Sequence, residues 1–139
     1  MSTLHLEREN GEVCDFRAGS SDGTGHSDQE AVFRYSLSKN VFIATLNSTG
    51  EDTTKQVVVK LAHGPDEMKA LEHEYWIYSE KLAHLQGSVV PQCMGFFIGS
   101  TPSNDDISCM VLEYCVPDLT ELLDEEKYRW VTLFFMCVV

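Results

Sequence analysis

Apolar residues alternate with polar ones, or run together, in five short segments that predict β-strands. The first three segments cover residues 31–37, 41–46 and 56–61 and are separated by polar turns. Two further segments, residues 92–98 and 107–116, are joined by a polar loop that contains Pro, Asn and Asp. The pattern therefore predicts a three-stranded meander, followed later in the chain by an antiparallel pair.

A helical period occupies the chain between these two groups of strands. Pro65 suits the first turn of a helix, and Gly87 suits the left-handed position after its last turn. Six apolar residues fall on one stripe when about 100° is advanced per residue. They are Met68, Leu71, Tyr75, Tyr78, Leu82 and Leu85. We expect one amphipathic helix that packs against the sheet.

Composition divides the chain into three parts. Residues 1–29 are rich in Gly, Ser, Asp and Glu, and they are predicted to be disordered. Residues 30–117 hold all the predicted strands and the helix, so they predict one α+β domain with a five-stranded antiparallel sheet and one main helix. Residues 118–139 end in an apolar run over 130–139, which is about half the roughly 20 residues that span a bilayer. This run either begins a further helix or is sequence read past a natural boundary.

Charge and cysteine content narrow the expected partners and compartment. The formal net charge is −12 with only 10 Lys+Arg, which argues against binding to nucleic acid or to an anionic membrane surface. The 5 cysteines are odd in number, are not spaced as a zinc site and follow no secretory signal. We therefore expect reduced thiols, in the cytoplasm or nucleus, and no metal site.

Three β-branched residues precede Lys60, which predicts a strand that is covered on both faces and carries one buried cation. The helix offers four glutamates as partners: Glu67, Glu72, Glu74 and Glu80. From the centre of the apolar stripe, Glu74 lies about 60° to one side, Glu72 about 100° to the other, and Glu80 roughly opposite. Glu67 lies in the first turn, where the helix dipole accounts for a carboxylate. Glu74 is therefore the predicted partner of Lys60.

The order strand lysine, helix glutamate, then Leu112-Glu113-Tyr114-Cys115 resembles the small lobe of protein kinases, especially divergent fungal kinase-like sequences. The resemblance covers about residues 30–123. In that family the lysine and glutamate hold the phosphates of ATP. The resemblance implies that Leu112 guards the adenine pocket and that Glu113 and Cys115 offer it a backbone acceptor and a backbone N–H. It also implies that Asp118 contacts ribose.

Two more residues are assigned to the nucleotide by the same resemblance. Val41 aligns with the valine of the second kinase strand, and Val58 replaces the alanine that touches adenine, so a larger side chain crowds the base there. Arg34, Ser36 and Lys39 stand where the family has the glycines of its phosphate loop, which puts nucleotide affinity in doubt.

The sequence contains no H-R-D and no D-F-G motif, so the large lobe of a kinase is missing. The resemblance implies an ATP-binding lobe from a family that transfers phosphoryl groups to protein hydroxyls, in a chain that is incomplete or inactive. Whether the chain is an enzyme stays open, and no Mg²⁺ is expected without the missing lobe. The alternative is a non-catalytic, pseudokinase-like module that binds another protein through its exposed lobe surface.

Overall fold

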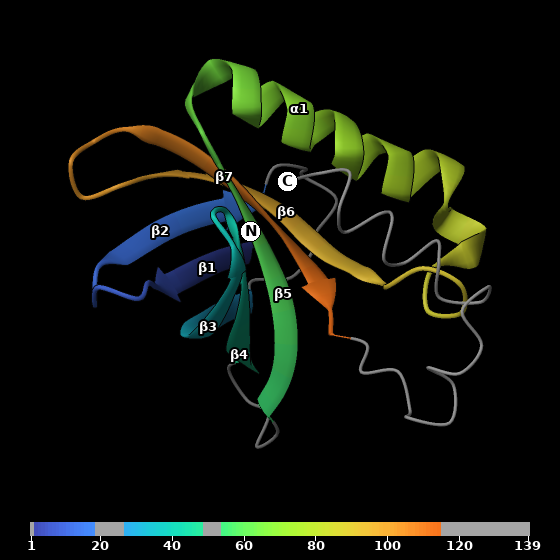
Figure 1. The fold of residues 1–139 in the computed structure, drawn as a ribbon, viewed down its shortest axis with the longest axis horizontal. Helices are drawn as coiled ribbons and strands as arrows, with labels where there is room; N and C mark the ends of the chain where they lie inside the picture. Colours follow the sequence, from blue (N-terminus) through green and yellow to red (C-terminus); the bar gives the residue numbers. More distant parts are fainter. Residues whose placement is uncertain (1, 19–26, 49–53, 115–139) are drawn as a thin grey trace.

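The computed structural model describes residues 2–18, 27–48 and 54–114, and within them the strands form one closed barrel with a single long helix on its outside (Figure 1). The strands are β1 (Ser2–Glu7), β2 (Val13–Ala18), β3 (Ser27–Ser38), β4 (Val41–Ser48), β5 (Thr54–His63), β6 (Cys93–Ser100) and β7 (Asp106–Glu113). The helical segments are α1 (Gly64–Trp76), the π-helical turn η1 (Ile77–Lys81) and the 3-10 turn η2 (Ala83–Leu85).

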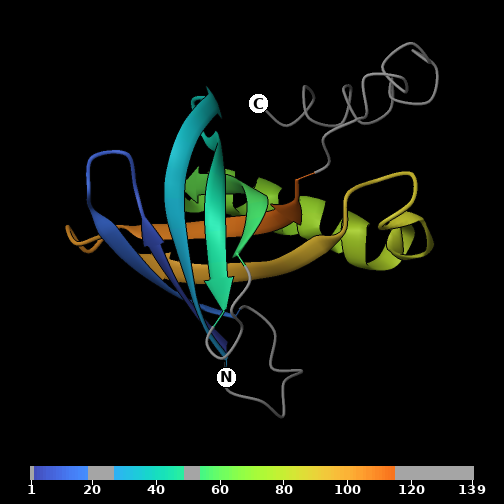
Figure 2. The same cartoon turned by 90° about the horizontal axis from the view of Figure 1, so that it is seen from below.

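The strand order around the barrel is β1-β2-β6-β7-β5-β4-β3, and β1 closes the ring by pairing with β3. The β1–β3 pair is parallel, whereas the other neighbours are antiparallel. Figure 2 looks at the barrel from the side opposite α1. Within the described residues each strand therefore has a neighbour on both sides, although residues 33–38 of β3 pair with β4 alone.

The predicted five-stranded antiparallel sheet with one main helix, the layout of a protein-kinase small lobe, is therefore wrong. The five strands expected between residues 31 and 116 are present as β3 to β7, but β1 and β2 add two more and make the sheet closed and mixed. Both extra strands lie within residues 1–29, the segment predicted to be disordered. Each is 6 residues long and follows a period of two, with Leu4, Leu6, Cys14 and Phe16 buried and their neighbours more exposed. The polar composition of the segment hid this short alternation.

Two apolar clusters lie on the two faces of the sheet. One fills the barrel, and the other lies between the outer face of the barrel and α1, which runs across β5, β7 and β6 in Figure 1. Strand β5 contributes to both, because Val57 and Val59 point into the barrel while Val58 points toward the helix side. The outer cluster also contains Leu71 from α1 and Tyr78 from η1. This confirms the prediction that β5 is covered on both faces.

The helix follows β5 with no loop between them. Gly64 has φ 82°, a left-handed conformation that glycine adopts without strain, and it turns the chain from the end of β5 directly into α1. Pro65 lies in the first turn as predicted. The side chain of Glu67 accepts a hydrogen bond of 2.7 Å from the backbone N–H of His63 and so caps the helix start. The position of α1 on the sheet is thereby tied to the end of β5.

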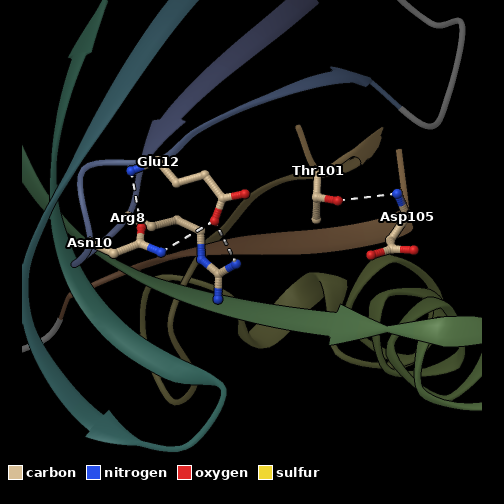
Figure 3. Close-up of polar contacts among 5 residues, drawn as sticks. All are labelled: Arg8, Asn10, Glu12, Thr101 and Asp105. Atoms are coloured by element: carbon tan, nitrogen blue, oxygen red, sulfur yellow. Dashed lines mark hydrogen bonds and ion pairs between the residues drawn. The ribbon is translucent and has the colours of Figure 1, made fainter. Parts of the chain in front are cut away.

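Short hydrogen-bonded turns connect the two strands of the β1–β2 hairpin and of the β6–β7 hairpin (Figure 3). In the β1–β2 turn, the backbone N–H of Arg8 donates to the carbonyl of Glu12 at 2.8 Å, and Asn10 accepts from the Glu12 N–H at 3.0 Å. In the β6–β7 turn, the hydroxyl of Thr101 accepts from the N–H of Asp105 at 3.1 Å. These contacts fix the register of the hairpins that complete the barrel.

Barrel closure can be tested at Gly99, where β6 meets β2. A Cβ atom at this position would lie 2.1 Å from the backbone oxygen of Asp15, so Gly99→Ala must push the two strands apart. We expect this substitution to lower the free energy of unfolding by at least about 2 kcal/mol in urea titrations. The control is Ile98→Val at the half-exposed neighbour, which should stay within about 0.5 kcal/mol of the wild type. Equal stabilities of Gly99→Ala and the wild type would contradict the β2–β6 pairing.

Candidate functional site

Lys60 is a charged residue buried in the outer face of the barrel, with only 2% of its surface exposed. It lies on β5 directly opposite Val41 on β4 and Met110 on β7. Both neighbours belong to the apolar cluster under α1. An ammonium group in such surroundings carries a large desolvation cost unless an opposite charge compensates it.

The compensating charge is Glu74 on α1, as the helical spacing predicts. One carboxylate oxygen, Oε1, lies 2.5 Å from the Lys60 Nζ, and Glu74 is 5% exposed. The other three candidate glutamates are engaged or exposed: Glu67 caps the helix, and Glu72 and Glu80 face solvent. The predicted pairing of Lys60 with Glu74 is thus confirmed, while a role for the pair in binding a cofactor stays a prediction.

The two carboxylate oxygens of Glu74 differ in their contacts. The second carboxylate oxygen of Glu74, Oε2, is buried and has no hydrogen-bond partner within residues 2–18, 27–48 and 54–114. Burial raises the pKa of Glu74, and the nearby Lys60 charge lowers it by a smaller amount. An acceptor left without a partner in a buried position is costly to folding stability.

The residues assigned to the nucleotide base lie beside the ion pair on the same face of the sheet. Val58 is directly opposite Leu112 on β7, two residues along the strands from the pairing of Lys60 with Met110. Val41, Val58 and Leu112 all belong to the apolar cluster of the outer face. Three of the predicted base-contact residues are therefore brought together next to Lys60.

Glu113 is held at the end of β7 by contacts to Gln92. Its backbone N–H donates to the carbonyl of Gln92 at 2.9 Å, and its carboxylate accepts from the Gln92 N–H at 3.3 Å. The remaining two assigned residues, Cys115 and Asp118, lie outside the described part of the chain. The predicted backbone contact through Glu113 stays a prediction.

Two residues that the sequence did not single out lie on the same face of the sheet as Val58 and Leu112. Ile43 lies opposite Val58, and Tyr35 lies opposite Ile43, so both share the face that carries Leu112. The hydroxyl of Tyr35 is 3.3 Å from that of Tyr114, which packs against the same apolar cluster. This contact raises the pKa of Tyr114. The bulge between Phe33 and Tyr35 shifts the register there, and no local pattern announced it.

A cavity of about 370 Å³ opens beside Lys60, at the start of α1. Its walls come from the β3–β4 turn at residues 38–40, from Val41 and Lys60, and from the first turns of α1 around Glu67. The turn is attached to the lysine strand, because the N–H of Leu61 donates to the carbonyl of Asn40 at 2.8 Å. Lys60 thus lies in the wall of a hollow whose two sides are joined by a backbone hydrogen bond, and its own side chain is buried.

Metal and membrane features were sought in the described part of the chain. Residues 2–18, 27–48 and 54–114 contain no group of three or more His, Cys, Asp or Glu placed to hold a metal ion. No helix within the same ranges has the length and apolar character needed to cross a membrane.

Comparison of the chain with protein-family models, with curated proteins and with solved structures found no match. The resemblance to protein kinases therefore rests on the residues quoted from the sequence, and the closed mixed barrel differs from the layout of a kinase small lobe.

The raised pKa of Glu74 predicts how stability depends on pH. The folded chain holds the proton above the ordinary value of 4.5, whereas the unfolded chain loses it near that value. As pH rises from about 4.5 through the folded-state pKa, the unfolded state is favoured and stability falls, by up to about 1.4 kcal/mol per pH unit. Urea unfolding of the wild type between pH 4 and 8 should show this fall relative to Lys60→Met/Glu74→Gln, which has no charge at the site. A rise of this difference with pH would contradict the assignment.

Proposed function

We propose that the outer face of the barrel binds a nucleotide of the ATP type, with its phosphates at Lys60. The observation that carries this proposal is the buried Lys60–Glu74 pair beside a cavity. A buried ion pair is weak evidence for stability, because apolar residues of similar volume usually stabilise a core as well or better. A cation held in a fixed direction at the wall of a hollow is better explained as an anion-binding group.

The residues assigned to the base form an apolar row beside Lys60. Val58 and Leu112 lie opposite each other and are 1% and 0% exposed, and of this row the cavity is lined by Val41, so a base has to displace what covers Val58 and Leu112. Ile43 is added to this apolar surface by the structure. Ligand sites of this kind are mostly apolar, with a few fixed polar groups that set orientation.

The proposal is limited to binding. Phosphoryl transfer in the resembled family needs an aspartate from an H-R-D motif and a metal ligand from a D-F-G motif, and the sequence contains neither. For the compartment we propose the cytoplasm or nucleus, because Cys14, Cys93 and Cys109 are unpaired thiols in this structure.

A second candidate function is a protein-binding module, and the contact between Tyr35 and Tyr114 favours it. These two hydroxyls meet over the row that contains Ile43 and Val58, where the base would lie. Tyr35 is 47% exposed and its neighbour Leu37 is 53% exposed, so this end of β3 presents apolar surface to solvent. A base has to displace this contact, whereas a protein partner can bind the exposed end of β3 with the contact in place.

Calorimetric titration of ATP into the full chain tests the first candidate function, nucleotide binding. Lys60→Met alone leaves Glu74 buried without its partner and costs about 3–5 kcal/mol of folding stability. The informative variant is therefore Lys60→Met/Glu74→Gln, which removes both charges together. We expect this double variant to bind ATP at least about tenfold more weakly than the wild type, because it lacks one charge-assisted contact to the phosphates.

Lys55→Met is the matched control, because Lys55 lies on the same strand but faces solvent. Its ATP affinity should stay within about twofold of the wild type, as expected for an exposed charge. Equal affinities of the double variant and the wild type would contradict the proposed site. Absence of ATP binding by the folded wild type would favour the protein-binding module.

A further inference from the structure

The second half of β3 is an edge strand among the described residues. Residues 27–32 of β3 pair with β1, whereas residues 33–38 pair with β4 alone. The outer side of residues 33–38 therefore carries backbone N–H and C=O groups that no other described strand uses. Tyr35 and Leu37 on this stretch are 47% and 53% exposed. We call residues 33–38 the β3 edge, and an extended segment can add to it as a further strand.

The β3 edge is short and irregular, which limits what can pair with it. Two register shifts, after Phe33 and after Ser36, interrupt its ladder with β4, and Arg34 places an exposed charge on it. Bulges and charges on an edge weaken pairing between separate molecules. A segment of the same chain needs less intrinsic affinity, because a tether raises its effective concentration to roughly the millimolar range. These features favour a segment of this chain over a second copy.

The described chain ends beside this edge. Tyr114 is the last described residue, and its hydroxyl lies 3.3 Å from that of Tyr35. Residues 115–129 separate Tyr114 from the apolar run over 130–139. A linker of this length can span at most about 50 Å, whereas the β3 edge is about 20 Å long. The apolar run can therefore reach every part of the edge.

The composition of the apolar run suits an added strand. Residues 130–139 contain no charged residue, no Gly and no Pro. Most of them are β-branched or aromatic, the residue types that strands favour. These are Trp130, Val131, Thr132, Phe134, Phe135, Val138 and Val139. Apolar side chains of this number need a covered position, and the exposed side chains of Tyr35 and Leu37 offer an apolar surface to pack against.

We propose that residues 130–139 pair with the β3 edge of the same molecule as a further strand and cover Tyr35 and Leu37. Backbone hydrogen bonds to residues 33–38 attach the apolar run, and its side chains supply the apolar burial. A protein partner that binds this end of β3 then has to displace the run. This inference depends on the exposed end of β3 and not on the nucleotide site, so it stands or falls separately from ATP binding.

Amide hydrogen exchange on the full chain tests this pairing. Alternate N–H groups of a strand point to opposite sides, so Phe134→Pro/Phe135→Pro removes a donor on whichever side faces β3. Amides of residues 33–38 that point away from β4 should exchange at least about tenfold faster in this variant than in the wild type. Leu122→Pro/Leu123→Pro is the matched control, because it makes the same kind of change outside the apolar run, and those rates should stay within about twofold. Amides of β5, which pairs on both sides, report that the barrel is folded in each variant.

The exchange rates also distinguish the possible occupants of the edge. Protection of residues 33–38 that is independent of protein concentration and is lost in Phe134→Pro/Phe135→Pro alone supports the proposal. Equal rates in this variant and the wild type overturn it. Protection that grows with protein concentration, together with a dimer mass in light scattering, assigns the edge to a second copy and also overturns it. Failure of the chain to bind ATP changes none of these outcomes.

Discussion

The ion pair between Lys60 and Glu74 is the constraint around which the outer face of the barrel is organised. Its two charges are almost completely shielded from water, and its atoms Nζ and Oε1 are 2.5 Å apart. Either charge alone would be costly in the apolar cluster under α1, so the helix must keep one angular position relative to β5. The loop-free junction at Gly64 supplies this alignment, because the helix starts where the lysine strand ends. Fold and site are therefore fixed by the same contact.

Closure of the barrel makes the lysine strand rigid. Strand β5 lies between β4 and β7, with Val57 and Val59 packed inside the barrel and Val58 packed under the helix. A strand packed on both faces leaves its lysine little freedom, which reduces the entropy that binding would otherwise cost. The N-terminal strands β1 and β2 take part in the site only indirectly, by completing the interior against which β5 packs.

The features that could be predicted from the sequence were those that depend on local, periodic patterns of residues. Three β-branched residues before Lys60 indicated a strand buried on both faces, and the angular position of Glu74 singled it out among four glutamates. The closed barrel escaped prediction because the parallel pairing of β1 with β3 joins strands without any local signature, and the apolar residues of β1 and β2 are few. The helix was predicted to continue toward residue 87, but it widens into the π-helical turn η1 after Trp76. The contact between Tyr35 and Tyr114 depends on a β-bulge and on a sequence separation of 79 residues, so no short pattern encodes it.

The central claim is that Lys60, held by Glu74, faces a ligand anion from the wall of a cavity. The most direct measurement is nuclear magnetic resonance of the full chain, isotopically labelled at the lysine side chains and the backbone amides, during addition of ATP. The account predicts that ATP shifts the Nζ signal of Lys60 and the backbone amide signals of Val58, Leu112 and residues 38–40. The Nζ signal of Lys55 should not shift. Unchanged signals at Lys60 and in this turn at saturating ATP would contradict it.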